Sequence, residues 1–387
     1  MKMNRSLALY YHSVADNVGH TFSHVSLSFD VFERQMRYLA KNNFNTVPLS
    51  QLFEYIKNGE RPARTVALTF DDGYLDNWVF VYPILKKYRL CANVFITPDF
   101  VDPRDIVRPN LANTELSELR KDRAGWWGYA SWPELREMAK DRTFEIHSHG
   151  MTHDWCFSSS KITDFYLPGS DYYWLSWKFE PKTKPFWLTD PSPGKNLLGH
   201  PIYEHGPGLV TKQYKRDQRL SNYLIEYVKE NDGQQFFDQQ GWLDKLNNIT
   251  DDYTRGHELS DSCETQQQYL ARLQWELEES KYQIKHNLGI EAKFFCWPNG
   301  AYTKLTHKIA VEQAGYDATV TTREWPKPTA KNLLGRVSFG QGWCTGKYAS
   351  QLLYIKFISA VESRSGTGLK HNLIRFFQNT KSFVGAK

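Results

Sequence analysis

Short apolar runs alternate with stretches of helical spacing along most of the 387-residue chain. Between the runs, apolar residues recur every three or four positions, as they do over residues 29–41 and 265–287, which is the period of an amphipathic helix. This alternation is typical of parallel sheets, because a connection between two parallel strands has to be long enough to hold a helix. We therefore predict an α/β chain with a parallel sheet or barrel, whose strands cover residues 7–11, 66–70, 92–97, 144–146, 293–297 and 318–321.

Capping signals mark the ends of two predicted helices. Ser131 stands before Trp-Pro-Glu, so its side chain is expected to cap a helix that carries Pro133 in its first turn. Gly289 follows the long helical pattern, and a glycine at that place is typical of a helix that ends in the left-handed conformation. The sequence therefore fixes the start of one helix and the end of the other.

The alternation stops between residues 156 and 262, where the chain is dense in tryptophan, tyrosine, proline and glycine. A helical pattern near residues 219–229 is the clearest element there. Aromatic residues make up 15% of the whole chain, which suits both a thick aromatic core and platforms on which sugar rings stack. We interpret the chain as an α/β core of residues 1–155 and 263–345, an inserted cap or side subdomain of residues 156–262, and a C-terminal helical tail of residues 346–387.

Charge and cysteine content argue against several classes of protein. The 48 lysines and arginines exceed the 43 aspartates and glutamates by only 5, whereas nucleic-acid binding needs a clustered basic face. The 5 cysteines are odd in number and show no CxxC spacing, which argues against a disulfide framework or a zinc knuckle. The first apolar run is too short for a signal peptide, and no stretch reaches the ~18 apolar residues of a membrane span. We therefore expect a reduced, cytoplasmic protein.

Two adjacent carboxylates, Asp71 and Asp72, follow an alternating apolar run and precede Gly73. Barrel enzymes place their catalytic groups at the carboxyl ends of strands. At such a turn one carboxylate can face a metal ion while its neighbour faces the water bound to that ion. An ordinary Asp-Gly turn is the alternative that this motif alone leaves open.

Three histidines, His147, His149 and His153, lie within seven residues of each other. His149 and His153 are four positions apart, so on a helical turn they would share a face and could chelate one cation. Together with a carboxylate they would make a three-ligand site, which leaves a coordination position open for water. His147 and His149 on one face of a strand are the rival ligand pair.

Two weaker signals complete the set of candidate residues. Pro298, Asn299 and Gly300 follow a predicted strand, and such a turn can aim backbone N–H groups at a developing oxyanion. His12 follows the first strand. A barrel would bring it to the same face as the other strand ends, although a histidine at a strand end is otherwise structural.

In this order, the Thr-Phe-Asp-Asp-Gly motif at residues 69–73, the Ser-His-x-x-x-His motif at 148–153 and the aromatic-Pro-x-Gly turn at 297–300 resemble polysaccharide deacetylases with a NodB-type domain. The early Tyr-His pair, followed by Phe-Glu-Arg-Gln-Met-Arg-Tyr-Leu, is similar to the branch of poly-N-acetylglucosamine deacetylases whose catalytic histidine motif lies near the N-terminus. The resemblance covers residues 5–155 and 263–340.

This resemblance implies a distorted (β/α)7 barrel that removes N-acetyl groups from an amino-sugar glycan with the help of one divalent metal ion, for which we expect zinc. It makes Asp72, His149 and His153 the metal ligands. It makes Asp71 the general base and His12 the general acid, with Asn299 supplying an oxyanion N–H group. It places Tyr74, Trp297 and Pro298 at the substrate.

The chain departs from the family pattern in two places. Many relatives carry an arginine near the third motif, where this chain has Cys296 and Trp297, so the partner that keeps Asp71 ionised is not identified. The usual late Leu-x-His motif is also absent, which the early His12 explains.

Other functions fit parts of the same pattern. A sugar deformylase or an O-acetyl esterase would use the same site, whereas a silent glycan-binding module would have lost Asp71 or a ligand histidine, and a structural metal site would be closed by a fourth ligand. The expected substrate is an N-acetylated glycan or a lipid-linked oligosaccharide at the inner face of the membrane. Residues 370–377 mix basic and apolar side chains, so they either touch an anionic membrane surface or pack as an ordinary terminal helix.

Overall fold

The computed structural model describes residues 7–15, 25–60, 62–121, 126–190, 192–322, 331–338 and 349–364. Its largest sheet contains 9 strands, and its main path runs β14-β13-β12-β7-β6-β5-β1-β15, with β4 paired to β5. The strands are β1 (Leu7–Tyr11), β4 (Asn45–Thr46), β5 (Thr65–Asp72), β6 (Ala92–Ile96), β7 (Phe144–Ser148), β12 (Phe294–Cys296), β13 (Ala318–Thr321), β14 (Leu333–Gly335) and β15 (Val337–Ser338).

One short segment joins the two edges of this sheet. Residues 333–335 pair in parallel with β13, and residues 337–338 pair in parallel with β1. The other strand pairs of the sheet are parallel as well. The sheet therefore curls into a nearly closed barrel. Its strands are β1, β5, β6, β7, β12, β13 and the combined β14–β15 segment. This confirms the predicted barrel.

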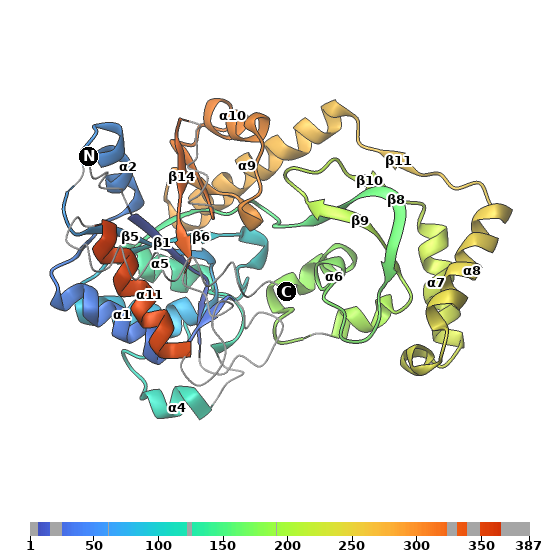
Figure 1. Cartoon of the computed structure of the whole chain (residues 1–387), viewed down its shortest axis with the longest axis horizontal. Helices are drawn as coiled ribbons and strands as arrows, with labels where there is room; N and C mark the ends of the chain where they lie inside the picture. Colours follow the sequence, from blue (N-terminus) through green and yellow to red (C-terminus); the bar gives the residue numbers. More distant parts are fainter. Residues whose placement is uncertain are drawn as a thin grey trace.

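Helices cover the outside of the barrel (Figure 1). Along β5, Val66, Leu68 and Phe70 belong to the large apolar cluster that the strands share with these helices. Ala67 belongs to a smaller cluster of side chains from several strands, because successive side chains of a strand point to opposite faces. The helices are α1 (Phe29–Lys41), α2 (Leu49–Lys57), α3 (Tyr82–Tyr88), α4 (Leu116–Lys121), α5 (Trp132–Lys140), α9 (Gln266–Leu288), α10 (Lys304–Glu312) and α11 (Ala349–Arg364).

Both predicted capping signals are confirmed. Ser131 and Glu134 form a reciprocal capping box at the start of α5. Gly289 ends α9 with a φ of 70°, in the left-handed region that glycine enters without steric cost.

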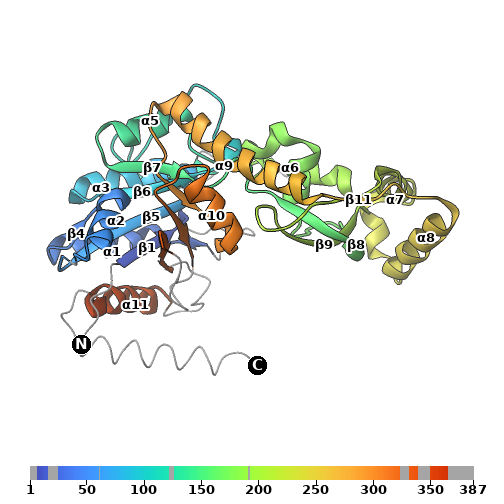
Figure 2. The ribbon, with the colours of Figure 1, turned by 90° about the horizontal axis from the view of Figure 1, so that it is seen from above.

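Residues 155–263 form a lobe beside the barrel (Figure 2). A long antiparallel hairpin of β8 (Trp155–Phe165) and β9 (Pro201–Pro207) leads into it. Two apolar clusters fill the lobe, one rich in tryptophan and tyrosine and one around α7 and α8. Its other elements are α6 (Trp174–Phe179), the 3-10 helices η4 (Pro181–Phe186), η5 (Ser192–Leu197) and η6 (Gly233–Asp238), β10 (Tyr214–Lys215), α7 (Gln218–Glu230), α8 (Trp242–Gly256) and β11 (Ser262–Cys263).

The last described helix, α11, packs against α1. The Tyr38 hydroxyl donates a hydrogen bond of 2.8 Å to Glu362, and the Arg34 guanidinium lies 4.3 Å from the centroid of the Tyr354 ring. The basic segment at residues 370–377 lies outside the described residues. Among the described helices, none has the length and apolar character to cross a membrane.

Candidate active site

The two adjacent carboxylates sit where β5 leaves the barrel. Asp72 has a φ of 72° and Gly73 a φ of 75°, so the chain turns sharply and departs from strand alternation. A Cβ at Gly73 would lie 3.0 Å from the Ile96 Cγ2 atom, which explains the need for glycine there. His149 has a potential metal-ligand atom within 4.8 Å of one from Asp71 and of one from Asp72. Asp71 and Asp72 therefore flank the same histidine.

Asp72, His149 and His153 form a candidate metal centre. The Asp72 Oδ1 atom lies 3.3 Å from His149 Nε2 and 3.7 Å from His153 Nε2. The potential ligand atoms of the three residues all lie within 4.8 Å of one another. His147, the rival ligand, instead places its Nε2 atom 3.3 Å from Glu145 and contacts the rings of Phe95 and Phe294.

The chemistry of this donor set fits a divalent cation. Asp72 Oδ1 is buried and accepts no hydrogen bond of ordinary geometry from the described residues. The Cys296 carbonyl oxygen lies 2.9 Å from His149 Nδ1, which fixes the ring and leaves Nε2 free to bind a metal. Two nitrogens and one oxygen with an open fourth position are typical of catalytic zinc sites.

The pKa values of these residues agree with a cation site. Burial lowers the pKa of His153 to about 4, so its ring is neutral, as a metal ligand must be. Burial alone would raise the pKa of Asp72, but the neighbouring histidines outweigh it and hold that pKa well below its usual value. Burial likewise opposes charge on His149, yet the surrounding negative groups raise its pKa, so a cation has to displace a proton there.

The histidine loop differs from the helical turn that the spacing suggested. β7 ends at Ser148, and the chain continues as a loop in which Gly150 has a φ of 90° and His153 a φ of 55°. Glu276 of α9 braces this loop by accepting hydrogen bonds from the N–H groups of Met151 (2.9 Å) and Thr152 (3.0 Å) and from the Thr152 hydroxyl. Loop geometry, and not helical periodicity, therefore brings the two histidines together.

Arg336 is the partner of Asp71 that sequence reasoning missed. Its Nη1 and Nη2 atoms each donate a 2.7 Å hydrogen bond to one oxygen of the Asp71 carboxylate. Both side chains are almost fully buried. Burial raises the pKa of Asp71, but the Arg336 charge outweighs it and holds this pKa below its usual value. Asp71 is therefore an ionised carboxylate inside the barrel.

The position of Arg336 in the chain explains why the sequence did not identify it as the partner of Asp71. It is the residue between β14 and β15, at the point where the closing segment passes from one edge of the sheet to the other. Arg336 Nη1 also donates to Thr69 Oγ1 (3.0 Å), and Nη2 lies 3.0 Å from Cys296 Sγ. The only signal in the sequence is one arginine between apolar residues at 333–337, which points to a buried partner without naming it.

His12 completes the group of charged residues. It follows β1, its carbonyl oxygen accepts a 2.9 Å hydrogen bond from Asn77, and its half-buried ring packs edge-on against Tyr10. Burial lowers its pKa, although the charges of Asp72 and Asp71 partly offset that effect. The charges of Asp72, Asp71 and His149 all act on the His12 imidazole, so the ring lies near the candidate metal centre.

The third motif is placed differently from expectation. The Trp297 ring is fully buried, 4.8 Å from the Phe295 ring and 6.4 Å from the Tyr302 ring. It therefore has no surface to offer a substrate, contrary to the sequence-based expectation. Pro298 is buried as well, whereas Asn299 is exposed with a φ of 56°.

An aromatic wall connects the metal centre to the lobe. Phe100 lies 5.7 Å from the His153 ring and stacks on Tyr129 at 4.6 Å. Tyr129 also stacks on Tyr74 at 5.2 Å, and its hydroxyl accepts a 3.0 Å hydrogen bond from the Trp187 indole of the lobe. Tyr74 is thus close to the site, as expected, but it is buried within this stack.

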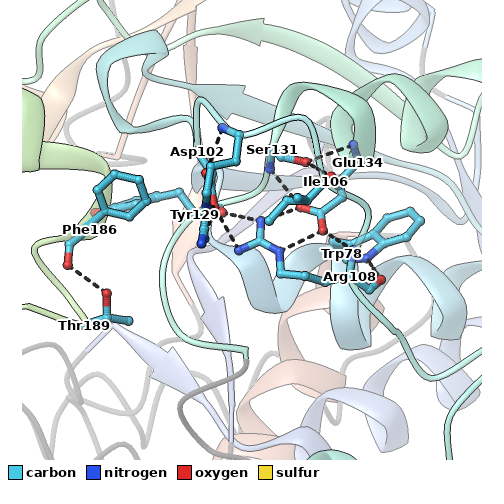
Figure 3. A network of polar contacts seen from close by, with 10 residues as sticks. Trp78, Asp102, Ile106, Arg108, Tyr129, Ser131, Glu134, Phe186 and Thr189 are labelled. Carbon is cyan, nitrogen blue, oxygen red and sulfur yellow. Dashed lines mark hydrogen bonds and ion pairs between the residues drawn. The ribbon is translucent and has the colours of Figure 1, made fainter.

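A polar network holds Tyr129 in place (Figure 3). Arg108 donates to the Tyr129 carbonyl at 2.9 Å and to both oxygens of Glu134 at 2.9 and 2.6 Å. The Asp102 carboxylate forms an ion pair with Arg108, with 3.3 Å between Oδ2 and Nη1. Hydrogen bonds and ion pairs through Arg108 therefore tie Tyr129 to Asp102 and Glu134.

A buried lysine joins the lobe to the histidine loop. Lys184 of η4 places its Nζ atom 2.9 Å from the Asp154 carboxylate and 3.4 Å from that of Asp99, and it donates to the Thr152 carbonyl oxygen. Its side chain is only 2% exposed. The residues on both sides of His153 are therefore tied to the lobe.

Comparison with known proteins identifies similar sequences and a similar fold. Residues 58–165, which contain both carboxylates and all three histidines of the second motif, match the family model for polysaccharide deacetylases. The chain is 31% identical over 166 residues to the poly-β-1,6-N-acetyl-D-glucosamine N-deacetylase of Staphylococcus aureus strain MSSA476, covering 40% of this chain and 50% of that protein. It is 28% identical over 147 residues to the enzyme of the same name from Escherichia coli K12, covering 38% of this chain and 20% of that protein.

The chain thus spans about half the length of the staphylococcal relative. A de-N-acetylase from Aggregatibacter actinomycetemcomitans has a similar fold, with a TM-score of 0.52 and 17% sequence identity. That match covers 90% of this chain and 99% of the other, so the shared fold extends over nearly the whole molecule.

Proposed function

We propose that the chain is a polysaccharide deacetylase, the family whose model matches residues 58–165, and that it hydrolyses N-acetyl groups of an amino-sugar glycan or of its precursor. The observation that carries this proposal is an ionised carboxylate, Asp71, beside a separate set of two histidines and one carboxylate. A base and a cation site at that spacing are what hydrolysis of an unreactive amide requires.

Asp72, His149 and His153 would hold one divalent cation, and the nitrogen-rich donor set favours zinc. When bound, this ion would supply Lewis-acid chemistry and make a water molecule more acidic. Cys296 holds the His149 ring, and Glu276 holds the loop that carries His153. The chain therefore presents the ligands in a preorganised arrangement.

Asp71 would act as the general base. Arg336 keeps its carboxylate ionised, and each Asp71 oxygen retains a lone pair that Arg336 does not use. A water molecule attacking the acetamide carbonyl would give its proton to one of these oxygens. Because the pair is bidentate, the carboxylate is also fixed in orientation.

His12 would donate a proton to the nitrogen of the departing amine. Its lowered pKa makes the protonated imidazole a stronger acid. The exposed turn at Asn299 is proposed to direct a backbone N–H group at the developing oxyanion. Each proton-transfer group of this kind typically contributes about 100- to 10,000-fold.

Release of free amine on N-acetylated glucosamine oligosaccharides, compared with release from N-formyl and O-acetyl analogues, is the experiment that tests this function. Amine and acetate in equal amounts, with the N-acetyl substrate preferred, would support the proposal. Preferential turnover of the formyl or ester analogue would show that the same site serves the rival activity.

We predict that the purified protein binds one equivalent of zinc and loses it when both ligand histidines are replaced by alanine. Elemental analysis and zinc titration of chelator-treated protein measure this directly. His147→Ala is the control, because His147 faces Glu145 and not the site. Loss of zinc from the control alone would place the ion on the rival histidine pair.

We predict that Lys184→Met weakens zinc binding about 10- to 100-fold, the usual size of an effect from outside the ligand set. The variant leaves Asp99 and Asp154 without their shared cation, so the loop around His153 loses its anchor. Zinc affinity, measured by titration, and the rate of acetate release should fall together. Lys182→Met, an exposed neighbour in the same 3-10 helix, is the control, and equal zinc affinity in both variants would contradict the prediction.

Membrane contact through the tail and action on a lipid-linked precursor in the cytoplasm stay predictions of the sequence. Cell fractionation tests the location, and truncation after Gly368 tests the contact. An unchanged distribution of the truncated protein would contradict the membrane contact.

A further inference from the structure

Two buried polar residues, Asp76 and Asn77, take no part in the chemistry proposed above. They lie a few positions after the carboxylate turn, at the start of a π-helix, η1 (Asn77–Val81). Short π-helical segments are rare and are found frequently at functional sites. Asp76 is 4% exposed and Asn77 only 1%. Burying such polar groups is costly unless they are hydrogen-bonded, so their partners indicate what these two residues do.

Asn77 holds the backbone of His12. Its Nδ2 atom donates to the His12 carbonyl oxygen at 2.9 Å and to Asp76 Oδ1 at 2.7 Å. Both partners are acceptors, so the NH2 group has to face them and the orientation of the amide is fixed. Asn77 Oδ1 is left buried without a hydrogen bond from the described residues, which is a cost to the fold. The two bonds of the NH2 group therefore account for an amide at this position.

Asp76 holds the two residues that follow His12. The Ser13 hydroxyl donates to Asp76 Oδ2, and the Val14 backbone is hydrogen-bonded to the same carboxylate. These two residues form β2, which pairs in parallel with β3 (Ser26–Leu27). Burial raises the pKa of Asp76 to about 6, and no cation among the described residues offsets that rise. The bonds to the segment after His12 therefore account for this buried carboxylate.

His12 lies at the point where the chain leaves the barrel sheet. β1 ends at Tyr11 and pairs with β5, whereas β2 begins at Ser13 and pairs with β3. Asn77 follows Asp72 by five positions in the chain. The backbone on both sides of the His12 ring is therefore attached to the same segment that carries the two carboxylates of the site.

We propose that Asp76 and Asn77 are positioning residues, which hold His12 in the one place from which its imidazole can protonate the departing amine. Removing either would leave the imidazole chemically intact but displaced, and a displacement of about 1 Å can cost about 100-fold in rate. The proposal rests on the proposed function, because it concerns the acid of that reaction.

The nature of the leaving group separates positioning from folding. When the carbon–nitrogen bond breaks, its electron pair stays on nitrogen, and the His12 imidazolium gives up the proton that completes the amine. A para-nitrophenolate leaving group is a far weaker base and departs without a proton, so it gains little from a general acid. Displacement of His12 should therefore slow hydrolysis of an acetamide and not hydrolysis of para-nitrophenyl acetate.

Acetate release from N-acetylglucosamine oligosaccharides and from para-nitrophenyl acetate, measured on the zinc-loaded full chain, tests the proposal. We expect Asn77→Ala to lower kcat on the oligosaccharide about 10- to 100-fold, with little change in KM and none in the rate on the ester. Asn93→Ala is the matched control, because Asn93 is a fully buried amide of β6 that donates to the Leu68 carbonyl oxygen at 2.8 Å. It should lower stability without changing the ratio of the two rates.

A double variant makes the test independent of the ester. Once His12→Ala has removed the acid, no group is left to position, so adding Asn77→Ala should cause no further loss of acetate release from the oligosaccharide. A purely structural role would give the same further loss in both backgrounds. Asp76→Asn keeps the shape of the side chain but loses an acceptor oxygen, and it takes the place of Asn77→Ala if that variant does not fold.

A folded Asn77→Ala with the oligosaccharide rate of the unmodified protein would overturn the proposal. Equal losses on both substrates, or an additive loss in the double variant, would overturn it as well. If His12→Ala loses activity and Asn77→Ala does not, the positioning role fails while the proposed function stands. Full activity of His12→Ala would instead remove the acid from the proposed function, and with it the group that Asp76 and Asn77 would position.

Discussion

Replacing Asp71 by asparagine is expected to reduce kcat about 100- to 10,000-fold while zinc stays bound. The amide keeps the shape of the side chain but cannot take a proton from the attacking water. The metal ligands are Asp72 and the two histidines, so the cation site remains complete. Acetate release and zinc content, measured on the same preparation, separate the two roles.

Asp71→Asn also leaves the buried Arg336 charge without its partner, so its stability has to be measured alongside activity. Asp251→Asn, an exposed substitution on α8, is the control for both quantities. If Asp71→Asn lost its zinc while remaining folded, the two carboxylates would share the metal and the division of roles proposed above would be wrong.

Replacing Arg336 by methionine is expected to lower the free energy of unfolding by about 3–5 kcal/mol, the usual cost of breaking a buried ion pair from one side. The side chains of Arg336 and Asp71 are almost fully buried, so water cannot solvate the Asp71 charge once Arg336 is removed. Chemical denaturation at neutral pH measures the loss, with Arg255→Met as the control.

The pH dependence of Arg336→Met gives a second readout with a definite sign. In the unmodified protein the pKa of Asp71 is lowered on folding, so its contribution to stability is present above the pKa of an unfolded aspartate and is lost as pH falls through the folded pKa. Without Arg336, burial is opposed only by the weaker charges of His149 and His12, so we expect the pKa of Asp71 to rise. The variant should therefore lose stability as pH rises, and the acid limb of its kcat/KM profile should move to higher pH.

A double variant completes this test. Asp71→Asn combined with Arg336→Met removes both charges, so its stability should exceed the value expected from adding the two single losses. Strict additivity of the two losses would show that the pair is not coupled. An acid limb that does not move in Arg336→Met would show that the arginine does not control the charge of Asp71.

Local sequence patterns determined most of the secondary structure of the barrel. β1 and β13 have the predicted bounds, and α1 covers the predicted residues. These elements were readable because each lies within one continuous segment, where strand alternation or helical spacing records which side chains are buried. The motif order likewise pointed to Asp71, Asp72, His149 and His153, since each motif is contiguous.

Tertiary structure decided what depends on residues that are distant in the chain. Arg336 meets Asp71 across 265 positions, and Lys184 reaches the histidine loop from the inserted lobe. The burial of Trp297, like the pairing of Asp71, depends on how strands and helices pack around a closed barrel. A sequence records which side chains are apolar or charged, but burial and pairing between distant segments arise only when the barrel closes and the lobe docks beside it, because only then do these groups lose water and meet their partners.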